Sequence, residues 1–139
     1  MRISFLRILG RRGVAATELA ILTPMMLALL FGVVDVSNSV QTSIRLEHAV
    51  QSGARYALAN ASDMSAVRSA VIAAWPQLTT TNVPLPVLSC ECAGTVVACT
   101  ASCAGGLVRI VTITATRPLS PLLISTLNRS TGNAVARLQ

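Results

Sequence analysis

The sequence predicts an α+β protein, with a long N-terminal helix, a short second helix and a small antiparallel β-sheet that carries disulfides. Three observations predict this class: a long apolar run near the N-terminus, a helix-periodic stripe after it, and a two-residue alternation near the C-terminus. With 139 residues, the chain has room for one domain at most. We expect a basic leader at 1–13, a transmembrane helix at 14–36, an extracytoplasmic helical region at 37–76 and a disulfide-bonded β-region at 77–139.

The apolar run extends from Leu19 to Val34 and is interrupted only by Thr23 and Pro24. Counted from Val14, it is long enough, at about 1.5 Å per residue, to span a hydrocarbon core of about 30 Å. Pro24 favours a kink or local unwinding, which a membrane span tolerates. The arginines before the run predict, by the positive-inside rule, a cytoplasmic N-terminus and an extracytoplasmic remainder. They are Arg2, Arg7, Arg11 and Arg12.

Three interpretations of this run compete. A secretory signal peptide is the weakest interpretation, because the apolar region of a signal peptide is shorter than this run. In addition, no convincing Ala-x-Ala cleavage site precedes Asp35. A plain signal anchor, which is not cleaved, explains only the arginines. A processed anchor, which the family resemblance given below implies, also explains Gly13, which follows the arginines. It explains Glu18 as well, because a carboxylate at the start of a membrane span is costly enough that it usually marks function. We prefer the processed anchor.

Helical periodicity continues beyond the membrane. An i, i+3/i+4 stripe of mainly small residues comprises Leu46, Ala49, Val50, Gly53, Ala54, Ala57, Leu58 and Ala61. The stripe fits a core face or a subunit contact face, and both interpretations stay open. Residues 60–63 predict the end of this helix followed by a new N-cap. A second stripe from Met64 to Trp75 predicts a short helix that Pro76 closes.

The C-terminal half changes to a β-pattern. Residues 79–86 are expected to form a loop, because they are rich in polar residues and proline. β-Branched residues alternate over 108–117, which predicts a strand that Pro118 ends. A last, weak strand is expected over 133–138, after a turn at 131–132.

Four cysteines lie between that loop and the first strand, at Cys90, Cys92, Cys99 and Cys103. Four thiolates in a short segment can bind zinc, but neither pair has the C-x2-C spacing of most zinc ribbons and fingers. An exported chain enters an oxidising compartment where disulfides persist, so we expect two disulfides. Of the three possible connectivities we favour the nested one, which joins Cys90 to Cys103 and Cys92 to Cys99 across a hairpin. Sequence alone leaves the pairing open.

The composition argues against several functions. The formal net charge is +6, but from Val14 onward seven arginines face five acids, which leaves +2. No basic stripe interleaved with aromatic residues is present, so nucleic-acid binding is not expected. An exposed polar helix face explains His48 beside Glu47, and the five acids are too scattered for an acid/base pair. We therefore expect neither an enzyme nor a cofactor or metal site.

Four motifs in the N-terminal part of the chain resemble those of a known protein family. They are Arg12–Ala20, Leu22–Pro24, Phe31–Gly32 and Val50–Ala57. Over about the first sixty residues the chain resembles the TadE-like proteins, minor pseudopilins of the tight-adherence (Flp/Tad) type IV pilus system. The cysteine pairs and residues 108–118 look similar to the family's C-terminal β-region. Small major pilins of this system carry a tyrosine where this chain has Leu19, which indicates a minor component.

The resemblance implies a pilin-like fold, cleavage by a prepilin peptidase between Gly13 and Val14, and pairing of Glu18 with the Val14 amine during assembly. The implied partners are the prepilin peptidase, other pilin and pseudopilin subunits, the pilus assembly platform and the lipid bilayer. The implied location is the bacterial inner membrane, as a single-pass protein with a cytoplasmic N-terminus and a periplasmic or extracellular C-terminal region. The resemblance also links the protein to cell adhesion through the pilus system. Two alternatives stay open: an unprocessed, signal-anchored periplasmic binding protein and a membrane-tethered zinc-binding module.

Overall fold

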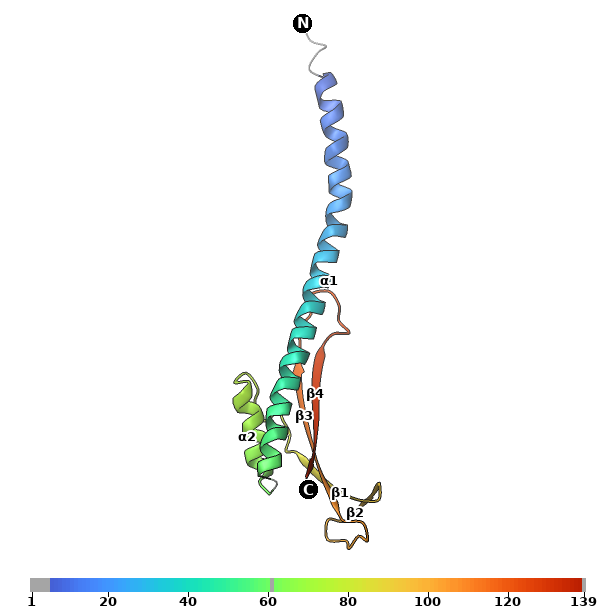
Figure 1. Ribbon diagram of the computed structural model, residues 1–139. Helices are drawn as coiled ribbons and strands as arrows, with labels where there is room; N and C mark the ends of the chain where they lie inside the picture. Colours follow the sequence, from blue (N-terminus) through green and yellow to red (C-terminus); the bar gives the residue numbers. More distant parts are fainter. Residues whose placement is uncertain (1–5, 61, 139) are drawn as a thin grey trace.

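The structure is a computed structural model that describes residues 6–60 and 62–138. It confirms the predicted α+β class, because two helices precede an antiparallel sheet. Within the described residues the elements are α1 (Leu6–Ala59), α2 (Met64–Ala74), β1 (Val87–Cys92), β2 (Thr95–Val97), β3 (Val108–Pro118) and β4 (Arg129–Leu138). Figure 1 shows the N-terminal half of α1 as a rod that projects from a head, which is formed by the C-terminal half of α1, α2 and the sheet.

Helix α1 contains 54 residues, so at about 1.5 Å per residue it is about 80 Å long. It continues through Pro24, and the local unwinding expected there does not occur. Pro24 has no backbone N–H to donate to the preceding turn. The neighbouring Thr23 hydroxyl donates to the Leu19 carbonyl oxygen at 2.7 Å, whereas the carbonyl that loses its helical donor at Pro24 is that of Ala20.

The C-terminal half of α1 is the centre of the head. It packs against β3 and β4, and α2 packs against it in turn (Figure 1). The sheet has the order β2-β1-β3-β4, and each neighbouring pair is antiparallel. The fully buried side chains come from α1, α2 and the β-region, so the ranges 37–76 and 77–139 share one core. The largest include Leu46, Val50, Val67, Val71, Val111 and Ile113.

The small-residue stripe on α1 is a core face. Its buried members are Leu46, Ala49, Val50, Gly53 and Ala57. Gly53 is required for this packing, because a Cβ there would overlap the Val71 side chain of α2. Leu58 departs from the core-face interpretation, because its side chain is 61% exposed. Leu58 lies about 100° around the helix from Ala57, which takes it off so narrow a face. Ala61 lies outside the described residues.

The last strand is longer than predicted. β4 begins at Arg129, and the turn expected at 131–132 does not form, because Gly132 pairs with Ala115 inside the sheet. The packing of β4 against α1 explains why residue 132 is a glycine. A Cβ on Gly132 would lie 2.9 Å from the backbone carbon of Leu46, so this residue lets β4 approach α1 closely.

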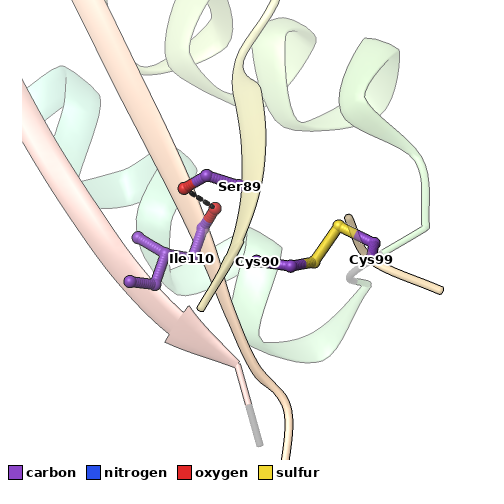
Figure 2. The surroundings of a disulfide bond; sticks show 4 residues. All are labelled: Ser89, Cys90, Cys99 and Ile110. Atoms are coloured by element: carbon purple, nitrogen blue, oxygen red, sulfur yellow. Dashed lines mark hydrogen bonds between the residues drawn. A yellow bond between two sulfur atoms is a disulfide. The ribbon is translucent and has the colours of Figure 1, made fainter. Parts of the chain in front are cut away.

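Both predicted disulfides are present, but the nested pairing was wrong. The bonds join Cys90 to Cys99, with their Cα atoms 5.1 Å apart, and Cys92 to Cys103, with their Cα atoms 5.9 Å apart. Figure 2 shows the first bond beside the hydrogen bond from the Ser89 hydroxyl to the Ile110 carbonyl oxygen. The four cysteines were therefore correctly assigned to disulfides and incorrectly paired.

The position of the hairpin turn explains the pairing. β1 and β2 are joined at Ala93 and Gly94, which both have positive φ, so the turn directly follows Cys92. The residue opposite Cys90 is then Val97, which leaves Cys99 two residues further along the chain. A nested pairing needs the turn midway between Cys92 and Cys99. Because the turn comes earlier, Cys99 reaches Cys90 first and Cys103 is left for Cys92.

Helix α2 begins behind an N-cap, as residues 60–63 indicate. The Asp63 carboxylate oxygen Oδ1 accepts hydrogen bonds from the Ser65 hydroxyl at 2.6 Å and from the Ala66 and Ser65 backbone N–H groups at 2.9 and 3.0 Å. These bonds, the Ser65 hydroxyl first, lower the pKa of Asp63 from its ordinary value of 3.8. The cap therefore depends on an ionised carboxylate.

We expect this cap to weaken in acid. Because the pKa of Asp63 is lower in the folded than in the unfolded chain, its stabilising contribution is present above about pH 3.8 and is lost as the pH falls through the folded value. Asp63→Asn keeps a capping oxygen without the charge. Thermal unfolding of the full chain in detergent micelles should give a lower midpoint for Asp63→Asn at neutral pH, and the difference should close in strong acid. A gap that does not change with pH would contradict this role.

Candidate functional site

The N-terminal half of α1 is exposed and apolar. Leu19, Ile21 and Leu29 are 64–71% exposed, although each is a large hydrophobic side chain. The described residues contain one helix that is long enough and apolar enough to cross a membrane, and this helix lies near the N-terminus. Burial of such a surface in a bilayer is favourable, whereas its exposure to water is not. The helix therefore suggests a single-pass membrane anchor.

The predicted processing and assembly residues lie at the start of this rod. Arg2 lies outside the described residues, while Arg7, Arg11, Arg12 and Gly13 belong to the first turns of α1, of which the structure describes the backbone. Val14 and Glu18 are exposed and one helical turn apart, so they share a face. The Thr17 hydroxyl donates to the Val14 carbonyl oxygen at 2.8 Å within the same turn. An amine formed at Val14 would therefore start within one turn of the Glu18 carboxylate.

The cysteines lie far from this segment. β1 and β2, which carry the disulfide-bonded hairpin, form the end of the head opposite the N-terminus (Figure 1). The predicted site residues thus form two separate groups, one in the rod and one at the tip of the head. All four cysteines are bonded to one another, so they present no thiolate to a metal.

Asp35 joins the rod to the head, at the residue that follows the apolar run. Its oxygen Oδ1 accepts a hydrogen bond from the Leu122 backbone N–H at 2.8 Å. Its oxygen Oδ2 accepts from the N–H groups of Leu123 and Ile124, at 2.7 and 2.9 Å. The Asp35 side chain is only 4% exposed. One carboxylate therefore holds three consecutive backbone donors of the loop between β3 and β4 against α1.

Sequence reasoning missed the role of Asp35 and treated it as the end of the apolar run. A signal was available, because Asp35 is the one charged residue between Glu18 and Arg45. An isolated acid at the edge of a membrane span usually has a specific partner. Its partners are backbone groups about ninety residues away, and no side-chain pattern announces them.

A polar recess lies beside Asp35. It is lined partly by Arg45 of α1, Trp75 at the end of α2 and Arg117 of β3. The Arg117 guanidinium lies 4.7 Å from the centre of the Trp75 ring and donates to the Gln77 side-chain oxygen at 2.9 Å. In the part of the chain that the structure describes, no three His, Cys, Asp or Glu side chains gather as metal ligands would. The recess therefore offers cationic and aromatic contacts.

One comparison with known proteins found a match, and the match lies in the N-terminal part of the chain. Residues 13–55 match the TadE-like protein family. The matched segment begins at Gly13 and includes Glu18, Asp35 and most of the buried face of α1. The match supports involvement in Tad pilus systems in general. No match was found among curated proteins or among solved structures.

Proposed function

We propose that the protein is a minor pseudopilin that takes part in assembly of a Flp/Tad-type pilus. One observation carries the proposal: the match to the TadE-like family begins at Gly13 and covers an apolar helix that extends free of the head. In this function α1 crosses the bacterial inner membrane once. The arginine-rich leader stays in the cytoplasm and the head lies in the periplasm.

Processing would convert an anchored precursor into an assembly subunit. A prepilin peptidase cuts the peptide bond between Gly13 and Val14, which removes four arginines and leaves an ammonium group on Val14. Glu18 then pairs with that amine or with the amine of a neighbouring subunit. A charge in a membrane is costly alone, so pairing favours the packed arrangement of helices.

The head contributes a folded surface to this process. Its partners are the prepilin peptidase, other pilin and pseudopilin subunits and the assembly platform, and the bilayer holds α1 until assembly. We propose no catalytic reaction and no cofactor for it. The function is structural, and its chemistry is limited to one peptide cleavage performed by another protein.

We expect cleavage between Gly13 and Val14 in a host with an active prepilin peptidase. Intact mass of the membrane-extracted protein should correspond to residues 14–139, and to 1–139 when the peptidase is absent. Gly13→Val should block cleavage, because the resemblance places this residue directly before the cut bond. Gly32→Val is the matched control, since a side chain there has open space around it.

Full-length protein in the membrane of a host with an active peptidase would contradict the pseudopilin function. It would favour the other candidate, an unprocessed, signal-anchored periplasmic interaction protein. Efficient cleavage of Gly13→Val at the same bond would place the specificity of the peptidase elsewhere in the segment.

A further inference from the structure

The loop between β3 and β4, residues 119–128, lies beside the end of the apolar run. In Figure 1 it rises from the head along α1, on the side towards the N-terminus. Ile124 lines an apolar groove together with Leu29, Gly32 and Val33 of α1. Leu29 precedes Asp35 by six residues, or about 9 Å along the helix. A bilayer that covers the apolar run as far as Val34 therefore also reaches this loop.

The side chains of the loop suit a membrane interface. Residues 119–128 contain no charged side chain, and five of the ten are leucine or isoleucine. Leu122 and Leu123 are 67% and 55% exposed, so they are not used in the core of the head. Trp75 and Arg117, which line the recess next to the loop, are residue types that favour the headgroup region.

The backbone of the loop is also adapted to a medium without water. Irregular backbone is excluded from hydrocarbon unless its N–H groups have partners. Asp35 accepts hydrogen bonds from three consecutive donors, at residues 122–124. The Leu119 N–H donates to the Asn128 carbonyl oxygen at 2.8 Å, and the Leu127 N–H donates to the Ile124 carbonyl oxygen at 3.0 Å. The donors nearest the apolar run are thus already satisfied.

We propose that loop 119–128 is a second membrane contact, in which Leu122 and Leu123 enter the outer interface of the bilayer while Asp35 positions the loop against α1. The proposal adds a lipid-binding surface to the head and rests on α1 spanning the membrane, as in the proposed function. Two contacts on one bilayer restrict the depth and rotation of the anchor. The head of a waiting subunit therefore has a defined orientation towards its neighbours.

Three positions of nearly equal exposure test the depth of the loop. Leu29 in the rod, Leu122 in the loop and Val135 in β4 are 69%, 67% and 65% exposed. Each is changed to cysteine in the full chain and spin-labelled, while the native cysteines remain in disulfides. In phospholipid nanodiscs with one copy per disc, oxygen reaches labels in lipid and a polar nickel complex reaches labels in water.

The Leu122 label should be more accessible to oxygen than to the nickel complex, with the same preference as the Leu29 label. The Val135 label should show the opposite preference. If Leu122 behaves like Val135 while Leu29 remains in lipid, the second contact is overturned and the anchor stands. If Leu29 also behaves like Val135, the membrane span itself fails. A Leu122 label shielded from both reagents indicates a protein contact and likewise overturns the lipid contact.

A second measurement tests the positioning role of Asp35. Asp35→Ala removes the acceptor of the three N–H groups, so the label at Leu122 should become more mobile and more accessible to the nickel complex. Glu47→Ala is the control, because Glu47 is an exposed acid on the same helix. Circular dichroism of each variant checks that the head stays folded. An unchanged Leu122 spectrum in a folded Asp35→Ala protein would overturn the positioning role.

Discussion

Glu18→Ala is expected to abolish incorporation into pilus assemblies while leaving membrane insertion and cleavage intact. The apolar run that follows Glu18 is unchanged, and removal of an acid eases insertion because charges are disfavoured in a span. In the proposed function, what is lost is the partner of the Val14 amine. Removal of one member of a buried ion pair commonly weakens an association by about a hundredfold or more. Crosslinking to pilus subunits measures incorporation, and a membrane-fraction blot measures insertion.

Two further variants separate the effect of the Glu18 charge from the effects of side-chain shape and of acid removal in general. Glu18→Gln keeps the shape and a hydrogen-bonding side chain but loses the charge, so it should fail in the same way. Glu47→Ala removes an exposed acid from the head portion of α1 and should assemble normally. Wild-type piliation by Glu18→Ala would mean that Glu18 only complements the dipole at the start of the helix.

Sequence prediction succeeded for those elements whose signals lie within a few neighbouring residues. α1 and the start of α2 were predictable because hydrophobic periodicity, helix end and N-cap are all encoded within a few residues. The alternation over residues 108–117 identified β3 for the same reason. Gly132 was wrongly assigned to a turn because glycine marks both turns and close approaches, and only the packing of β4 on Leu46 decides between them.

The roles of Gly13 and Glu18 stay predictions from the sequence, whereas the contacts of Asp35 emerge only from the fold. Gly13 and Glu18 stand at a characteristic spacing in one short segment, so a family resemblance can identify them. Asp35 binds the backbone of residues 122–124, and backbone donors leave no mark in the sequence. The cysteine pairing depended on a turn at Ala93 and Gly94. Glycine favours a turn, but alanine rarely adopts positive φ, so a turn directly after Cys92 was not evident from the sequence.

The disulfides should stabilise the tip of the head substantially. On the chain-entropy model, loops with sequence separations of 9 and 11 residues are worth about 2–3 kcal/mol each. Loss of the Cys90–Cys99 bond should cost more than loss of Cys92–Cys103, because Cys90 is 1% exposed and its replacement by alanine also leaves space in a buried site. Chemical unfolding of the full chain in detergent, with each pair replaced by alanine, measures both effects.

Double variants also decide the pairing without peptide mapping. Cys92→Ala with Cys103→Ala leaves Cys90 and Cys99, which should form a disulfide and give no reactive thiol. Cys92→Ala with Cys99→Ala leaves Cys90 and Cys103, whose native partners are gone, and should give two reactive thiols under denaturing conditions. The reverse result would restore the nested pairing and place the hairpin turn after residue 94. Four reactive thiols in the unsubstituted protein, together with bound zinc, would instead show that the segment is a metal site.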